Sequence, residues 1–184
     1  MYNKRLTRLM KLAIASLSLA FLPTASHAID STSVEFAAGN KTKMLRLGAQ
    51  SEMNNRWWQS NGTHIGAYWD LTVAQWRQQQ YQSSPGRSKN IFDIGITPVF
   101  RYQNDTKLGL YGEIGIGAHV LSDLYDNNER RLSTRFQFGD HLGIGYVFSN
   151  KLDVGLKYQH FSNGGIKQPN NGVNFGVIRA SYKF

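Results

Sequence analysis

The final twelve residues of the chain, 173–184, read VNFGVIRASYKF. In an extended strand, every second residue of this stretch falls on the same side. That side carries Asn174, Gly176, Ile178, Ala180, Tyr182 and Phe184. Alternation with a period of two is typical of a β-strand with two different faces. The stretch therefore predicts a strand whose C-terminal end presents aromatic side chains.

Seven further runs of the same kind precede this strand. They are rich in aromatic and β-branched residues and are separated by Gly, Asn, Asp and Ser. Together with the last one, the runs lie near residues 32–39, 43–51, 63–79, 89–103, 108–121, 133–148, 152–163 and 172–184. In the fourth run, Ile94 and Ile96 share an apolar face, whereas Asp93 and Thr97 share the opposite, polar face. The sequence after residue 28 therefore predicts an all-β domain.

Two all-β folds fit this pattern: a soluble sandwich with its apolar faces inside, or a transmembrane barrel with its apolar face outside. The second face is too polar and too rich in glycine for a packed core. The C-terminal strand decides, because its final Phe184 resembles the aromatic C-terminal signature of bacterial outer-membrane barrels. An even number of strands with about 9–11 membrane-embedded residues also fits the eight runs. We predict an eight-stranded antiparallel transmembrane β-barrel of the bacterial outer membrane.

The connections between the runs alternate in length. Segments 103–107 and 150–151 are short, whereas segments 78–88, 121–131 and 162–172 are long. Outer-membrane barrels keep short turns in the periplasm and long loops outside. The last loop is therefore expected at the outer surface, near the outer leaflet.

Residues 1–28 are expected to form a cleaved secretory signal. Four basic residues precede the apolar run LAIASLSLAFL, and the segment ends in Ser26, His27 and Ala28. Cleavage after Ala28 leaves the barrel domain, residues 29–184. An uncleaved membrane anchor is the alternative, but the apolar run is about half of the ~20 residues that a spanning helix needs.

Charge and cysteine content limit the partners of the exported chain. After removal of the signal, the chain has 21 − 4 = 17 basic and 12 acidic side chains. It has no Lys- or Arg-rich run, which argues against nucleic acid as a partner. The chain has no cysteine, so disulfides and thiolate metal sites are excluded. The histidines lack metal-ligand spacing, and we expect no cofactor and no metal. Aromatic belts at the membrane interfaces are expected to hold Trp57, Trp58, Trp69 and Trp76.

The segment YQHFSNGG, residues 158–165, places a base and a hydroxyl on an otherwise apolar face. His160 and Ser162 stand two apart, so on a strand they share the side that is expected to face lipid. Polar residues near a membrane interface are often without a catalytic role. A serine hydroxyl beside an imidazole is also the arrangement that activates a nucleophile, because the imidazole accepts the hydroxyl proton.

The stretch HFSNGGIKQPNNG, residues 160–172, resembles the signature of the lipid A 3-O-deacylases, which are eight-stranded outer-membrane serine esterases acting on lipopolysaccharide. Weaker similarity runs through residues 56–70, 97–102 and 112–117. The resemblance implies Ser162 as the nucleophile and His160 as the base. It also implies an oxyanion hole formed by the backbone N–H groups of Asn163 and Gly165, supported by Asn170, where Gly164 and Gly165 let the backbone curl.

The third member of the triad departs from this family. The deacylases carry a glutamate twelve residues beyond the serine, where this chain has Asn174. An amide oxygen can accept the imidazole N–H, but an amide that presents its donor fixes the wrong tautomer. Asp140 is the alternative acid. If both apolar faces stay outward across the turn near 149–151, paired residue numbers summing to 300 set Asp140 beside His160.

Two other functions remain open at this point. Asn174 also resembles the Ser-His-Asn triad of the outer-membrane phospholipase A, but that barrel has twelve strands and residues 29–184 are too few for them. A catalytically silent interaction barrel is the second alternative. We predict lipopolysaccharide as the substrate, with Lys167 on the last loop as a contact for its phosphates. The sequence leaves a homodimer open.

Overall fold

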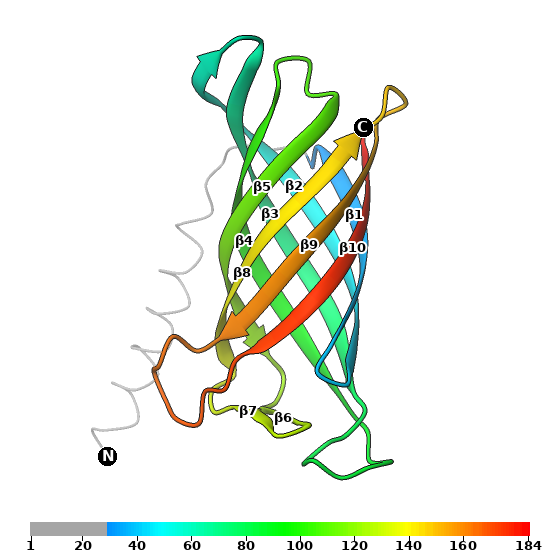
Figure 1. The fold of residues 1–184 in the computed structure, drawn as a ribbon, viewed down its shortest axis with the longest axis vertical. Helices are drawn as coiled ribbons and strands as arrows, with labels where there is room; N and C mark the ends of the chain where they lie inside the picture. Colours follow the sequence, from blue (N-terminus) through cyan, green and yellow to red (C-terminus); the bar gives the residue numbers. More distant parts are fainter. Residues whose placement is uncertain (1–28) are drawn as a thin grey trace, which may run out of the picture.

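The structure, a computed structural model, describes residues 29–184, so the predicted signal at residues 1–28 lies outside the described part. Ten strands form between short turns and long loops (Figure 1). They are β1 (Ser31–Gly39), β2 (Thr42–Ser60), β3 (Thr63–Gln78), β4 (Lys89–Asn104), β5 (Gly109–Leu121), β6 (Tyr125–Asn127), β7 (Arg130–Leu132), β8 (Phe136–Val147), β9 (Leu152–Ser162) and β10 (Val173–Lys183).

Eight of these strands close into one antiparallel barrel in the order β1-β10-β9-β8-β5-β4-β3-β2, which confirms the predicted fold. β1 pairs with β2 on one side and with β10 on the other, so no strand edge stays open. Closure lets the barrel strands pair their backbone groups with one another on both sides, as a lipid environment demands. β6 and β7 form a separate hairpin within the connection from β5 to β8.

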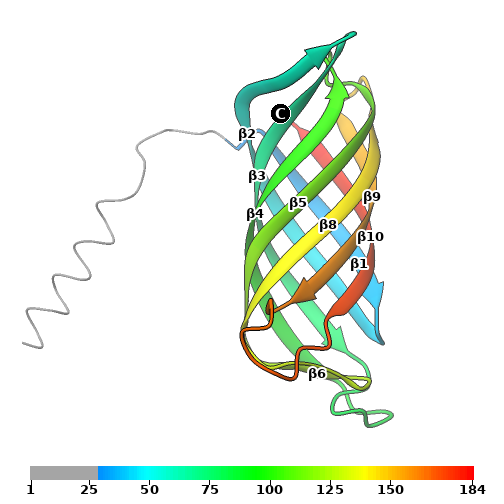
Figure 2. The ribbon, with the colours of Figure 1, turned by 60° about the vertical axis from the view of Figure 1, so that its left-hand side comes forward.

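The long loops gather at one end of the barrel, as predicted. The loops after β3, β5 and β9 lie together with the β6-β7 hairpin at the lower end in Figure 1, whereas the C-terminus lies at the opposite end. Figure 2 shows the same separation of the two ends. No helix among residues 29–184 is long and apolar enough to cross a membrane.

The second strand is longer than predicted. It continues beyond residue 51 to Ser60, and its hairpin with β3 rises past the barrel wall at the end opposite the long loops (Figure 2). Register shifts after Met53 and after Trp57 interrupt its alternation, which explains why the sequence pattern did not reveal the extension. Trp58, with φ +49°, is 83% exposed.

The outward face of the barrel is apolar. Its exposed side chains include Phe36, Leu45, Leu47, Leu71, Val73, Phe92, Ile94, Ile96, Ile114, Ile116, Leu142, Ile144, Leu156, Ile178 and Tyr182. These residues alternate along the strands with buried ones that point into the lumen. An apolar outside and a filled inside are the arrangement that a bilayer stabilises.

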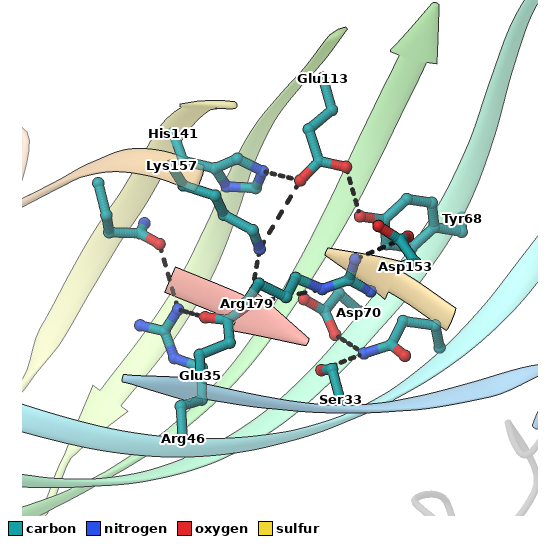
Figure 3. Close-up of polar contacts among 12 residues, drawn as sticks. Ser33, Glu35, Arg46, Tyr68, Asp70, Glu113, His141, Asp153, Lys157 and Arg179 are labelled. Carbon is teal, nitrogen blue, oxygen red and sulfur yellow. Dashed lines mark hydrogen bonds and ion pairs between the residues drawn. The ribbon is translucent and has the colours of Figure 1, made fainter. Parts of the chain in front are cut away.

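Buried charged side chains gather in the lumen, and Figure 3 shows part of their network. Arg101 donates to Glu113 at 2.7 Å and to Asp153 at 2.9 Å, and Arg179 donates to the same Asp153 oxygen at 3.1 Å. Glu35 accepts from Lys157 at 2.7 Å and from Arg46 at 2.9 Å. Glu35, Glu113 and Asp153 each have a cationic partner, as buried charges require, whereas the buried Asp70 accepts from the Gln50 amide at 2.7 Å.

An apolar cluster lies in the lumen toward the long loops, beside buried polar groups such as the His119-Asp93 pair, so the interior is not polar throughout. Trp76 is fully buried there, with its ring centroid 4.7 Å from that of Phe161 and 5.1 Å from that of Phe175. Trp76 therefore belongs to this interior cluster and not to an interfacial belt. Because Phe161 and Phe175 point inward, the residues that alternate with them on β9 and β10 face outward on a rigid wall.

Candidate active site

His160 and Asn174 face each other on the outer surface of β9 and β10. The two residues are Cα partners in the β9-β10 ladder, and His160 Nδ1 lies 2.5 Å from Asn174 Oδ1. An amide oxygen only accepts hydrogen bonds, so the proton of this pair resides on Nδ1. In the neutral imidazole the other ring nitrogen, Nε2, then carries no proton and is able to act as a base.

Ser162 is the last residue of β9 and lies on the same outward face, half-buried like His160. Two residues along a strand span about 6.6 Å between Cα atoms. Within residues 29–184, neither the Ser162 hydroxyl nor His160 Nε2 has a hydrogen-bond partner. The predicted base and the predicted nucleophile are thus neighbours on one face, and catalytic hydrogen bonds often tighten only around a substrate.

Asp140 flanks His160 on the other side. The two residues are Cα partners in the β8-β9 ladder, which is the register predicted from the sequence. The Asp140 backbone carbonyl accepts from Gln159 Nε2 at 3.2 Å, whereas its carboxylate has no hydrogen bond or ion pair among residues 29–184. His160 therefore sits between an amide that binds it and a carboxylate one strand away.

The loop after Ser162 is organised around the buried side chain of Asn163. Asn163 Nδ2 donates to the Lys167 carbonyl at 2.7 Å, and Asn163 Oδ1 accepts from the Gly165 N–H at 2.9 Å. Gly164 and Gly165 have φ of +63° and +85°, so the predicted curl is present. The Asn163 N–H donates to Asn170 Oδ1 at 3.0 Å.

Both N–H groups predicted for the oxyanion hole are therefore engaged within the loop. The Asn163 and Gly165 N–H groups can reach an oxyanion only when their bonds to Asn170 and Asn163 open. The Gly164 N–H, between them, has no acceptor among the described residues. Asn170 helps to hold the loop by accepting from the Asn163 N–H, while its supporting role and the oxyanion hole itself stay predictions.

Two residues that the sequence analysis missed shape this site. Gly172 has φ +63°, and a Cβ at this position would lie 2.6 Å from His160 Cε1, so the imidazole packs on bare backbone. Arg130 of β7 donates from Nη1 to the carbonyls of Asn171 at 2.8 Å and Gly172 at 3.3 Å. Gly172 could have been suspected from the strand-entry sequence NNG. The Arg130 contact joins two loops, and no local pattern signals it.

Further bonds tie the same two loops together. Asn171 Oδ1 accepts from the Arg131 N–H at 3.0 Å, and the Ser133 hydroxyl donates to the Pro169 carbonyl at 2.8 Å. The side chain of Lys167 is exposed and has no partner in residues 29–184. Among those residues, no three His, Asp or Glu side chains gather as a metal site would require.

The fold is that of an outer-membrane β-barrel, and its outer surface carries the residues predicted for a serine hydrolase, Ser162, His160 and Asn174. The chain belongs to the family "Lipid A 3-O-deacylase (PagL)", whose model matches residues 43–183. The lipid A deacylase PagL of Bordetella bronchiseptica is 30% identical over 99% of this chain and 97% of its own length. That of Pseudomonas aeruginosa is 28% identical over 90% and 92%.

Solved structures agree with this assignment. The crystal structure of the outer membrane enzyme PagL matches with a TM-score of 0.71 and 25% identity, covering 84% of this chain and 99% of that one. Neisserial surface protein A shares the barrel fold, with a TM-score of 0.50 at 14% identity, over 84% and 94%.

Proposed function

We propose that the protein is a lipid A 3-O-deacylase, an esterase that removes the 3-O-linked acyl chain from lipid A in the outer leaflet. The observation that carries this proposal is the His160-Asn174 hydrogen bond beside Ser162, on the lipid-facing wall of a barrel of this family. Lipid acyl esters reach this wall directly from the bilayer. A site inside the lumen would be closed to them.

The proposed reaction follows the serine-esterase course. The Ser162 Oγ attacks the ester carbonyl while His160 Nε2 accepts the hydroxyl proton. The tetrahedral intermediate collapses, the sugar oxygen leaves with that proton, and the acyl chain stays on Ser162. A water molecule, activated by the same nitrogen, then releases the fatty acid. Throughout, the hydrogen bond from His160 Nδ1 to Asn174 Oδ1 fixes the orientation of the imidazole ring. Nε2 therefore stays directed at the reacting atoms.

The negative oxygen of the tetrahedral intermediate needs donors that are already in place. We assign this role first to the Gly164 N–H, which has no acceptor among residues 29–184, with the Asn163 and Gly165 N–H groups joining it if the loop opens. The exposed Lys167 on the same loop is the proposed contact for a substrate phosphate. All these residues come from a single chain, so a homodimer is not needed for the reaction.

In the decisive experiment, purified protein is incubated with lipopolysaccharide in detergent. The mass of the lipid A product is then measured by mass spectrometry. We expect loss of the 3-O-linked acyl chain and release of the matching fatty acid, with Ser162→Ala as the inactive control. Excess chelator should leave the reaction intact. Glycerophospholipid is supplied in parallel. Its cleavage in place of lipid A, restored by Ca²⁺ after chelation, would favour the phospholipase alternative.

Arg130→Gln tests the contact between the two loops. We expect kcat/KM to fall about three- to tenfold, because the charge-assisted bonds that hold residues 171–172 against the imidazole are weakened. Arg131→Gln is the matched control, since the Arg131 side chain is exposed and pairs with Asp126 away from the loop. Equal rates for the two variants would show that the Arg130 bonds do not position His160.

A further inference from the structure

Two cations oppose each other on the outer surface at the loop end of the barrel. Lys43 of β2 and Arg77 of β3 are Cα partners, and both side chains are exposed. They share the outward parity of Leu45 and Leu47 on β2 and of Val73 on β3, so they border the lipid-facing apolar band. The pair therefore lies where apolar wall gives way to polar rim, next to the outer leaflet.

This arrangement carries unbalanced charge. Like charges directly opposite each other in a ladder are about 5 Å apart at Cβ and destabilise the sheet. Within residues 29–184, neither Lys43 nor Arg77 has a hydrogen bond or ion pair through its side chain. The next residue in the row is Asn90 on β4, which is neutral. The two cations thus lack a counter-charge among residues 29–184, whereas the lumen carboxylates Glu35, Glu113 and Asp153 each have a cationic partner.

We propose that Lys43 and Arg77 form a binding site for a phosphate group of a lipopolysaccharide molecule in the outer leaflet. A phosphate placed between two cross-strand cations accepts hydrogen bonds from both and removes their repulsion. Acyl chains of the same molecule would lie along the apolar wall below, over Leu45, Leu47 and Val73. Lipopolysaccharide phosphates are the anions expected at this depth and at this end of the barrel.

The site is separate from the catalytic residues. β10 and β1 stand between β9, which carries Ser162, and β2, which carries Lys43. Three strand spacings of about 4.8 Å place the two sites roughly 14 Å apart along the wall. The inference goes beyond the proposed esterase activity, because the site would hold a lipid whether or not the barrel cleaves it.

Binding is tested on the full barrel in neutral detergent, in a Ser162→Ala background so that no turnover occurs. Native mass spectrometry measures the dissociation constants for phosphorylated lipid A and for the same lipid after enzymatic removal of its phosphates. We expect the double variant Lys43→Gln/Arg77→Gln to bind phosphorylated lipid A about tenfold more weakly. It should bind the dephosphorylated lipid as the parent does. Lys43→Gln alone should weaken binding of phosphorylated lipid A by a smaller factor than the double variant does.

Lys151→Gln, at an exposed cation in the turn at the opposite end, is the matched control and should change nothing. Thermal unfolding followed by gel migration should show the double variant as stable as its parent or more so, since a repulsion is removed. The proposal is overturned if the double variant binds phosphorylated and dephosphorylated lipid A more weakly by the same factor. It is also overturned if the double variant binds both lipids as tightly as the parent does. Equal competition by phosphatidylglycerol or inorganic phosphate would also overturn it, because the occupant would then not be lipopolysaccharide.

Discussion

Ser162→Ala and His160→Asn are each expected to lower kcat/KM on lipopolysaccharide by on the order of 10³-fold or more, while the barrel still folds. Both side chains lie on the outward face and neither belongs to the interior cluster, so their removal creates no cavity. A serine without its base is a poor nucleophile, and a base without its serine has nothing to activate. The double variant should therefore be no slower than either single variant.

Heat-modifiable gel migration reports whether each variant forms the barrel. Tyr158→Phe is a suitable control, because Tyr158 is exposed on the same face, two residues before His160, and the change removes only a hydroxyl. Activity should stay at the parental level in this control. A folded Ser162→Ala protein that still releases fatty acid at the parental rate would end the serine-esterase proposal.

The fold could be predicted because apolar and polar residues alternate along each strand. Each barrel wall residue meets either lipid or lumen, so apolar and polar positions alternate with period two over most of the eight strands. The prediction failed where that rule is broken. Beyond Met53, shifts in the ladder remove the alternation from β2, and Trp76 has the parity of a lumen residue but the chemistry of a belt residue.

The site was only partly accessible from the sequence. His160 and Ser162 stand in one short motif, and parity placed Asn174 and Asp140 on the same face. The ladders then put Asn174 and Asp140 on either side of His160. Arg130 could not be found this way, because its bonds to residues 171–172 depend on how two long loops pack at the rim. The bonds that engage the Asn163 and Gly165 N–H groups likewise depend on the folded loop.

The remaining question is which side chain orients His160. The structure places the Asn174 oxygen 2.5 Å from Nδ1, whereas the Asp140 carboxylate makes no bond to the ring. We therefore expect Asn174→Ala to lower kcat/KM on lipopolysaccharide by roughly 10- to 100-fold, the range expected for a lost hydrogen bond to a group that becomes charged. Asp140→Asn should cost less, because it removes only a charge one strand away.

The reverse ranking would assign the role to Asp140, and near-parental rates for both variants would leave a Ser-His dyad without a third member. Folding is compared by gel migration, as for Ser162. The two substitutions are well matched, since Asp140 and Asn174 occupy equivalent ladder positions on either side of the same histidine.

Adding a carboxylate at position 174 separates orientation from charge. Asn174→Asp keeps the length of the side chain and hence the contact with Nδ1, while Asn174→Glu restores the residue type implied by the family resemblance. An amide can only orient the imidazole, whereas a carboxylate also stabilises the imidazolium that forms as Ser162 attacks. Both variants should therefore match or exceed the parental kcat/KM, and Asn174→Asp should do so without any change in ring position. If both instead lose activity as Asn174→Ala does, we would attribute the loss to the nearby Asp140 carboxylate, because two like charges on either side of one imidazole repel each other. That outcome would mean that the neutral amide at 174 and the carboxylate at 140 form a matched pair around His160.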